Sequence, residues 1–403
     1  MAKRGLAAIL LLGGLLRLGY GFAYPPPQNG LYDPDSYVVL ASSVADSWSL
    51  SENGKPSAHR EPAYPVALGL FFKLFGRSYR AVLGANIVFG LAALALLYAV
   101  GRRVFGEAAG LIAAGMAAVY PPFVFYCAQS LRETWMIAAS ALALWSLLEA
   151  LSRRTPGWFA AAGAANALAA LSNTVFLPFA LAAAPAIIFL CRRERRPWAG
   201  RAGLYAAVLI LAYAVWPVRN YMRFGTWVLG STAGAGSTFY TFLIAPQETG
   251  GTPEQQKFLE NDPAIIQSAG MDPLRMEHHF WKAGLERVRR APWAYVRLVA
   301  WRFFWDMWRP IPRPRAYAHP YALVRLAAIL TDCWIIPLGI VGMLWVRFRP
   351  LESLWLYLFL ASTDLVYSLV LTMNRYRFSL MPWIILFAAV MLERGRARLK
   401  RAV

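Results

Sequence analysis

Acidic residues are scarce in this sequence, and so is charge of either sign. The 403 residues include 21 Asp and Glu against 41 Lys and Arg, and only 15% of all residues are charged. Because a soluble domain usually carries about 25% charged residues, this composition argues against an ordinary soluble protein. The net charge of +20 would fit a nucleic-acid partner. However, the basic residues flank apolar runs, as they do at lipid headgroups, so we expect no nucleic-acid partner.

Cysteine is scarcer still. The three cysteines, Cys127, Cys191 and Cys333, are far apart and form no CxxC pair. This spacing suggests neither a disulfide framework nor a zinc site. We interpret the three as small apolar packing residues.

Long apolar runs fill much of the chain, in which 58% of the residues are hydrophobic. The runs at 81–100, 108–131, 155–191, 202–218 and 326–346 contain one acid between them, Asp332. A membrane-crossing helix needs about 20 mostly apolar residues, so the sequence predicts an all-α polytopic membrane protein. We place ten spans at residues 6–23, 81–100, 108–128, 132–150, 156–172, 174–190, 202–218, 326–346, 353–372 and 376–392.

The first span resembles a cleaved signal peptide. Lys3 and Arg4 precede it as a basic n-region would, and Ala23 could end a cleavage site. However, Arg17 interrupts the apolar stretch, and more membrane sequence follows. We therefore predict that this span is retained.

Arginines in the short loops orient the predicted spans. Short loops on one side are rich in Arg, whereas those near 129–131 and 172–174 have none. The positive-inside rule places the Arg-rich side, with both termini, in the cytoplasm. The residues on that side are Arg102, Arg103, Arg153, Arg154, Arg192, Arg193, Arg195, Arg196, Arg201, Arg347, Arg349 and the tail 394–401.

Two segments, 24–80 and 219–325, then face outward. The second is basic, but long loops translocate largely regardless of charge. Near its end, three Trp and three Arg recur at helical spacing, which predicts an amphipathic helix in the membrane interface. An eleventh span is the alternative, and a cost of about 2.5–3.5 kcal/mol for each Arg argues against it. These residues are Trp301, Trp305, Trp308, Arg297, Arg302 and Arg309.

The first outward segment contains "GLYDPDSYVVLA" at residues 30–41, with two acids in a chain that otherwise avoids them. Asp is a favoured N-cap and Pro a favoured first helical residue, so Asp33 before Pro34 is interpreted as a helix cap. Asp35 would lie in the first turn, where the helix dipole also favours a carboxylate. Its position at the outer membrane face also suits a proton acceptor or a cation ligand.

Two further motifs place acids beside arginines at the same face. "REPAYPVALGLFFKLFG" (60–76) is too short to span and predicts a helix along the membrane surface, which would bring Arg60 and Glu61 beside Asp35. "SLRETW" (130–135) places Glu133 at the outer start of the fourth span. The alternative for Glu133 is an ordinary first-turn acid paired with Arg132.

The motif "NRYRFSLMPW" (374–383) carries Arg375, Tyr376 and Arg377 at the outer start of the last span. Arg binds phosphate through forked, charge-assisted hydrogen bonds, so these residues and Arg219 are candidate phosphate ligands. An ordinary interfacial anchor is the alternative for the motif. Two acids inside spans, Asp332 and Asp364, are either functional or bonded to neighbouring helices.

In their order along the chain, "DPDSYVVLA", "REPAYPVALGLFFKLFG", "SLRETW", "WPVRNYMRFGTWVLGST" and "NRYRFSLMPW" resemble the bacterial GT-C glycosyltransferases. The branch they resemble is glycosyltransferase family 39, related to protein O-mannosyltransferases and the lipid A aminoarabinose transferase. Two positions differ from the pattern of many relatives. Asn173 and Thr174 stand where Arg-Pro is usual, and Asn374 stands where an acid often precedes "RYR".

The resemblance implies a single GT-C domain over residues 1–403 with about ten to twelve transmembrane helices and juxtamembrane helices in both outward segments. It further implies an enzyme of the bacterial cytoplasmic membrane, with an outward-facing active site. That enzyme would transfer a sugar, with inversion, from a polyprenyl-phosphate-linked donor to a glycan, lipid or protein acceptor. A role in lipopolysaccharide or exopolysaccharide synthesis would fit.

The same resemblance assigns roles to individual residues. Asp35 matches the family's proposed catalytic base, Glu133 the acid of the second outward loop, and Arg375 and Arg377 the "RYR" near the donor phosphate. Arg60 and Arg219 are further phosphate candidates, and Asp33, Glu61 and Tyr376 are supporting residues. A divalent metal held by Asp35 and Glu133 is left open, because hard cations favour oxygen ligands.

One alternative function belongs to another class, a transporter or flippase of lipid-linked saccharides. Such a protein is expected to place polar residues near the bilayer midplane, within broken helices or internal repeats. Only Asp332 and Asp364 lie that deep in the predicted spans, and the sequence shows no repeat. A non-catalytic accessory subunit is the third interpretation.

Overall fold

The computed structural model describes residues 2–193, 200–232, 234–244, 257, 259–313, 319–346, 351–373 and 375–402. Several residues used to orient the spans lie outside these ranges, namely Arg195, Arg196, Arg347 and Arg349, as does Asn374. The side chains of 191–193 and 397–402 are not described either. Helices dominate the described residues, and two two-residue strands form one hairpin. This confirms the prediction of an all-α protein.

The chain divides into two compact units, and the larger one contains most of the predicted spans. It comprises Met1–Gly230, Ile335–Thr363 and Phe378–Val403. Its elements are α1 (Ala2–Ala23), α2 (Tyr37–Ser47), β1 (Ser51–Glu52), β2 (Lys55–Pro56), α3 (Ala63–Phe75), α4 (Tyr79–Phe105), α5 (Glu107–Val119), α6 (Pro121–Cys127), α7 (Glu133–Arg153), α8 (Pro156–Ser172), η1 (Thr174–Phe176), α9 (Leu177–Arg193), α10 (Gly200–Phe224), η4 (Leu351–Ser353) and α19 (Met381–Ala402).

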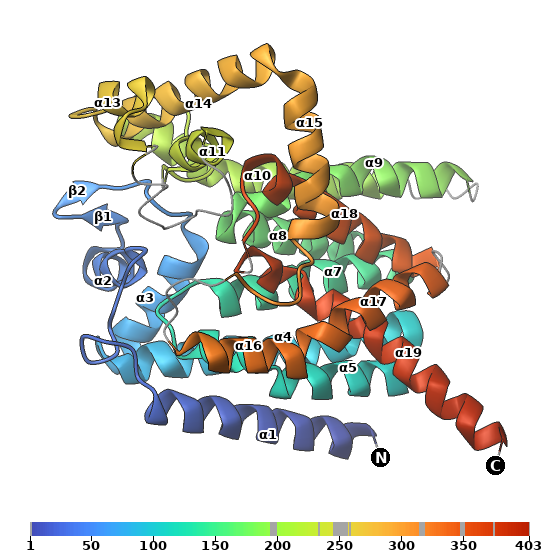
Figure 1. The fold of residues 1–403 in the computed structure, drawn as a ribbon. Coiled ribbons are helices and arrows are strands. Elements are labelled where there is room, and N and C mark those ends of the chain that lie inside the picture. Colours follow the sequence, from blue (N-terminus) through green and yellow to red (C-terminus); the bar gives the residue numbers. More distant parts are fainter. Residues whose placement is uncertain are drawn as a thin grey trace. The chain divides into compact units, whose positions relative to one another are not determined.

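Long helices pack side by side in this unit (Figure 1). Helix α7 packs between α4 and α8, α8 packs on α10, and α5 packs on α1, α4 and α19. Small residues allow the close approaches. A Cβ at Gly101 of α4 would lie 2.8 Å from the Cα of Gly110 in α5. Because lipid provides little hydrophobic drive between helices, such small residues are typical of membrane helix interfaces.

Every predicted span coincides with helical residues. Among the described residues, six helices are long and apolar enough to cross a membrane. They are α1, α4, α7, α10, α16 with α17, and η4 with α18. The pair α5 and α6 would make a seventh. The remaining predicted spans contain the 17-residue helices α8 and α9, and α19, whose second half is charged. The polytopic membrane fold is thus confirmed.

The third predicted span is not one straight helix. Helices α5 and α6 meet at a bend of 58°, and Tyr120 between them has an extended backbone with φ −66° and ψ 116°. Pro121 and Pro122 explain the bend. Proline lacks a backbone N–H, and its ring disfavours helical backbone at the residue before it.

The second unit comprises Ser231–Trp334 and Asp364–Arg377. It contains most of the long predicted outward segment. Its elements are α11 (Ala235–Ile244), α13 (Pro263–Gln267), α14 (Pro273–Arg290), α15 (Pro292–Trp301), the π-helix η3 (Arg302–Asp306) and α16 (Tyr321–Leu330). Helices α17 (Asp332–Val346) and α18 (Leu354–Val370), and η5 (Tyr376–Ser379), belong partly to each unit. The single domain expected over 1–403 stays a prediction.

The Trp/Arg segment near 292–309 is helical, but one of its arginines does not have the expected place. Trp301 and Trp305 are about half exposed, as the predicted interfacial helix requires. Arg302, however, is completely buried. It donates hydrogen bonds to the carbonyl oxygens of Ser368, Val370 and Phe242 at 3.0–3.2 Å. Arg302 therefore holds the second unit together instead of facing headgroups.

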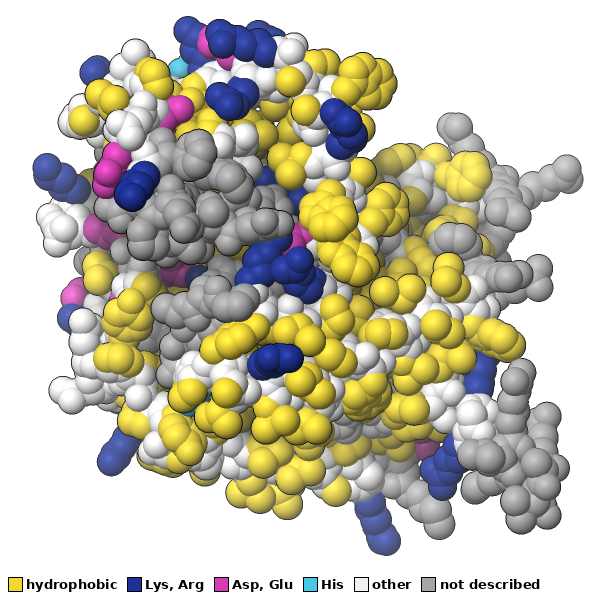
Figure 2. All heavy atoms as spheres, viewed as in Figure 1, with side chains coloured by type: hydrophobic (Ala, Val, Ile, Leu, Met, Phe, Trp, Pro, Cys, Tyr) yellow, Lys and Arg dark blue, Asp and Glu magenta, His cyan; other side chains and the backbone are white. Residues whose placement is uncertain are grey.

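Large apolar side chains are exposed on several spans. Helix α1 exposes Leu11, Leu15 and Phe22 at 58–65%. Helix α16 exposes Leu323 and Leu330, and Figure 2 shows hydrophobic side chains gathered where Figure 1 places α16. A soluble monomer rarely leaves so much apolar surface in contact with water, whereas a membrane protein covers it with lipid.

Candidate active site

The side chain of Asp33 caps helix α2 as expected, but it does so from three residues before the N-cap position, which is occupied by Ser36. Its carboxylate accepts hydrogen bonds from the backbone N–H groups of Tyr37, Val38 and Val39 at 2.7–3.0 Å. The helix begins at Tyr37 and not at Pro34, because Ser36 before it has a left-handed backbone with φ 62°. Burial raises the pKa of Asp33, although the three N–H groups act in the opposite direction.

Asp35 lies in the turn before α2, and not in its first turn as the sequence suggested. Its Oδ1 is 2.6 Å from Nη2 of Arg60, and the Nε of Arg60 donates to the backbone carbonyl of Asp35 at 2.9 Å. Both side chains are 16% exposed. Two bonds from one guanidinium fix the position of this residue. The predicted proximity of Arg60 to Asp35 is confirmed, while the catalytic role of Asp35 stays a prediction.

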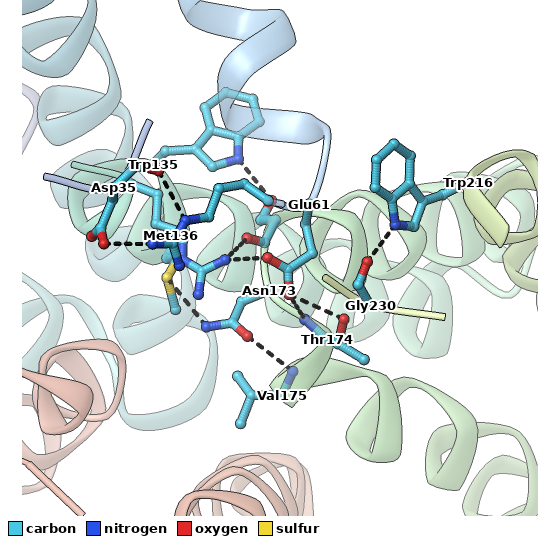
Figure 3. A network of polar contacts seen from close by, with 12 residues as sticks. Asp35, Glu61, Trp135, Met136, Asn173, Thr174, Val175, Trp216 and Gly230 are labelled. Atoms are coloured by element: carbon cyan, nitrogen blue, oxygen red, sulfur yellow. Dashed lines mark hydrogen bonds and ion pairs between the residues drawn. The ribbon is translucent and has the colours of Figure 1, made fainter. Parts of the chain in front are cut away.

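Glu61 is the centre of a second, deeper ion pair (Figure 3). It is 5% exposed and pairs with Nη1 of Arg132. Its Oε1 accepts hydrogen bonds from the backbone N–H and the hydroxyl of Thr174, both at 3.2 Å. Arg132 also donates to the carbonyl of Ser172. The sequence offered Arg132 as a partner of the adjacent Glu133, and the structure shows that Arg132 forms an ion pair with Glu61.

The environment of Glu61 favours its charged form. Burial alone would raise its pKa, but the Arg132 guanidinium and the hydrogen bonds outweigh burial, so the pKa is lowered. Thr174 supplies two of those bonds. The resemblance expects a proline at position 174, and a proline could donate neither bond because it lacks an N–H and a hydroxyl. The departure at this position therefore has a structural role in this chain.

The two ion pairs are joined by Tyr37, a residue that the sequence did not single out as functional. Its ring is 1% exposed and lies 5.5 Å from the Arg60 guanidinium carbon and 6.0 Å from that of Arg132. Burial raises the pKa of the Tyr37 hydroxyl; the positive charges of Arg132 and Arg60 act against that rise, and the negative charges of Glu61 and Glu133 add to it. Glu133 is itself 5% exposed. The four charged residues thus act on one buried tyrosine.

A second tyrosine extends this cluster. Tyr64 is fully buried, packs edge-on against Tyr37 with ring centroids 5.2 Å apart, and donates to Asn86 Oδ1 at 3.3 Å. Asn86 donates in turn to the carbonyl of Gln129, just before α7. The sequence offered one local signal for Tyr37, its position four residues after the capping residue Asp33. The other contacts of this cluster join residues far apart in the sequence.

Arg219 lies at the end of α10 and holds the hairpin segment in place. It donates to the carbonyls of Leu50 and Ser57 and to Asn220 Oδ1, all at 2.9 Å. In the same region, Trp216 donates to the carbonyl of Gly230 at 2.6 Å, as Figure 3 shows. These bonds give Arg219 a structural role, and its part in phosphate binding stays a prediction.

The "RYR" residues belong partly to the second unit. Arg377 is 3% exposed, pairs with Asp332 and donates to the carbonyl of Arg309 at 2.6 Å. Asp364 accepts from Trp308 Nε1 at 3.0 Å and from Ser368. The two intramembrane acids thus make bonds to other segments, as one of the alternatives held. Tyr376 stacks on Tyr367 with centroids 4.7 Å apart.

The donor-phosphate roles of Arg375 and Arg377, and the supporting role of Tyr376, stay predictions. So does the metal site at Asp35 and Glu133. Among the residues that the structure describes, no group of three or more His, Cys, Asp or Glu is arranged to hold a metal ion. A cation at Asp35 would have to compete with Arg60, which already pairs with that carboxylate.

Comparison with known proteins supports the resemblance. A family model described as dolichyl-phosphate-mannose-protein mannosyltransferase matches residues 55–221, a segment that includes Arg60, Glu61, Arg132 and Glu133. No curated protein sequence matches the chain.

Solved structures share the fold. The oligosaccharyltransferase AglB of Archaeoglobus fulgidus, in complex with an inhibitory peptide and a dolichol-phosphate, matches 99% of this chain with a TM-score of 0.57 and 16% identity. An oligosaccharyltransferase of the same organism, tethered with an acceptor peptide, matches 98% of this chain with a TM-score of 0.56 and 16% identity. This chain covers 51% and 50% of those two chains, about half of the archaeal enzyme's length.

A third solved structure is ArnT from Cupriavidus metallidurans bound to undecaprenyl phosphate. It matches 97% of this chain and 77% of its own, with a TM-score of 0.45 and 14% identity. This chain shares the fold of AglB, and the family match over residues 55–221 agrees with the resemblance to the GT-C glycosyltransferases.

Proposed function

We propose that the chain is a membrane glycosyltransferase that takes its sugar from a polyprenyl-phosphate-linked donor. The acceptor is a hydroxyl-bearing glycan, lipid or protein, and the reaction occurs at the outer face of a bacterial cytoplasmic membrane. The description of the matched family, which names a dolichyl-phosphate sugar, supports this donor class. So does the dolichol-phosphate in the AglB structure.

The observation that carries the proposal is the Asp35–Arg60 pair beside the buried Glu61–Arg132 pair. A carboxylate that accepts a proton must be held in one position, and Arg60 binds both the side chain and the backbone of Asp35. The cations stand within the same cluster around Tyr37. Preorganised cations stabilise the charge that develops on a departing phosphate.

The reaction is a single displacement. The acceptor hydroxyl oxygen attacks the anomeric carbon, a new C–O bond forms, and the bond from that carbon to the phosphate oxygen breaks. The hydroxyl proton passes to Asp35, and the polyprenyl phosphate leaves with the bonding electrons. Attack from the face opposite the leaving group inverts the anomeric configuration. A positioned general base contributes about 10²–10⁴-fold to such a step, and Arg60, which contacts that base, is a candidate for binding the phosphate.

The test is donor turnover by the purified chain in proteoliposomes. Undecaprenyl-phosphate hexoses and pentoses serve as donors, and the total lipid and protein fraction of a bacterial envelope serves as acceptor. We expect labelled sugar on an acceptor and an equal amount of free undecaprenyl phosphate. Movement of intact donor between leaflets without release of undecaprenyl phosphate would instead support a flippase, and binding without either outcome would support an accessory subunit.

A further inference from the structure

Arg17 is a buried cation inside the first membrane-spanning helix. Its side chain is 2% exposed, although α1 as a whole is among the least buried spans. Its Nη1 donates to the carbonyl of Gly13 at 2.9 Å and to that of Ala118 at 3.1 Å. A charged residue at membrane depth is costly and is therefore a functional hypothesis by default.

The bond to Ala118 explains part of this placement. Ala118 lies at the C-terminal end of α5, directly before the 58° bend into α6. Carbonyl groups at a helix end have no partner within the helix, and inside a membrane they need one from the protein. The C-terminal end of a helix also carries partial negative charge. Arg17 supplies both a hydrogen-bond donor and a positive charge at the C-terminal end of α5.

Arg17 lines a small cavity. Among the residues that the structure describes, neither the Nε of Arg17 nor the hydroxyl of Thr134 has a hydrogen-bond partner. Thr134 is 3% exposed and, with Arg17, lines a cavity in which about 10 Å³ is available to the centre of a water molecule. Leu94, Ile137 and Phe123 supply apolar walls. That volume corresponds to about one water molecule, which needs two to four polar partners.

Gly90 of α4 keeps this space open. A Cβ added at Gly90 would lie 3.1 Å from the Nε of Arg17 and 3.4 Å from Cγ2 of Thr134. The missing side chain therefore lies beside the Nε of Arg17 and the methyl group of Thr134. Because Gly90 lines the cavity, a methyl group there would crowd the Nε and take room from a molecule bound in the cavity.

We propose that one ordered water molecule occupies this cavity, accepts a hydrogen bond from Arg17 Nε and is bonded to the hydroxyl of Thr134. The water and the bond to Ala118 tie α1, α5 and the first turn of α7 together. Because Glu133 directly precedes Thr134, Arg17 becomes a positioning residue for the candidate site. This last step rests on the proposed function, whereas the water site does not.

The water site is tested by structures of the full chain in nanodiscs at a resolution that shows ordered water. We expect density between Arg17 Nε and Thr134 in the wild type and its loss in Thr134→Val and in Gly90→Ala. A dry wild-type cavity would overturn the proposal. Density that strengthens when bromide replaces chloride would also overturn it, because the occupant would then be an anion.

Donor turnover of the same variants tests the positioning role. A displacement of about 1 Å can cost about 10²-fold in rate, so we expect Gly90→Ala to lower kcat about tenfold or more with little change in KM. Thr134→Ser, which keeps the hydroxyl, should restore the rate lost in Thr134→Val. Gly84→Ala is the matched control, because a Cβ there meets nothing within 4 Å. Loss of the water with unchanged kcat would refute the positioning role and leave the water site standing.

Discussion

Removing Arg132 should destabilise the protein far more than removing an exposed arginine. In Arg132→Met, the carboxylate of Glu61, which is 5% exposed in the wild type, loses its charged partner. Breaking a buried pair in this way costs about 3–5 kcal/mol. The two bonds from Thr174 remain, so we expect a value near the lower end, about 3 kcal/mol.

Glu61→Gln should cost less than Arg132→Met, about 1–3 kcal/mol, because Arg132 keeps its bond to Ser172 and some access to water. The double variant should be less destabilised than the sum of the two single variants, with a coupling energy of about 1–3 kcal/mol.

The lowered pKa of Glu61 sets the pH dependence of this stability. The stability that ionised Glu61 contributes to the folded protein is fully present above the unfolded-state pKa of about 4.3. This stability is lost as the pH falls through the folded-state pKa.

The assay is unfolding in detergent or lipid, followed between pH 3 and pH 7. Arg153→Met is the matched control. It removes an ion pair with Glu149 on the surface of α7, where Arg153 is 56% exposed, and should cost at most about 0.5 kcal/mol. The reasoning fails if Arg132→Met costs no more than this control, or if Glu61→Gln is as destabilised relative to wild type at pH 3 as at pH 7.

Three further changes test other parts of the structure. Asp33→Ala removes a cap that binds three N–H groups and should cost about 1–2 kcal/mol in thermal unfolding, whereas Asp33→Asn should cost less. Arg302→Met leaves three buried carbonyls without their donor, so limited proteolysis should cut the second unit sooner; unchanged cleavage would contradict its structural role. Arg377→Met leaves Asp332 buried without its ion pair, and Arg377→Met/Asp332→Asn should recover part of the lost thermal stability.

Much of the fold follows from local sequence properties. Each predicted span lies on helical residues because an uncharged run of about 20 residues has few other ways to satisfy its backbone in a membrane. The bend at Tyr120 was foreseeable from Pro121 and Pro122, yet hydropathy treats those prolines as ordinary members of the run. The burial of Arg302 was not foreseeable, because its partners Ser368 and Val370 are more than 60 residues away.

The contacts of the candidate site were also predictable only in part. That Asp33 caps a helix was predictable, since Asp is a favoured capping residue, but the start of that helix at Tyr37 was not, because Asp before Pro predicts a start at Pro34. The Asp35–Arg60 contact was predicted from two motifs at one membrane face. Glu61 binds residues 71 and 113 positions away, and no local pattern names such partners. The sequence therefore pointed to the Asp35–Arg60 pair, but not to the pair of Glu61 with Arg132.

The most direct test of the account compares Asp35→Asn with Asp46→Asn in the sugar-transfer assay. Asp46 is the matched control, because it pairs with Arg77 at the exposed end of α2, where its side chain is 59% exposed. We predict that Asp35→Asn folds and binds undecaprenyl phosphate but transfers sugar about 10²–10⁴-fold more slowly, while Asp46→Asn transfers at the wild-type rate. Wild-type transfer by a folded Asp35→Asn variant would contradict the account.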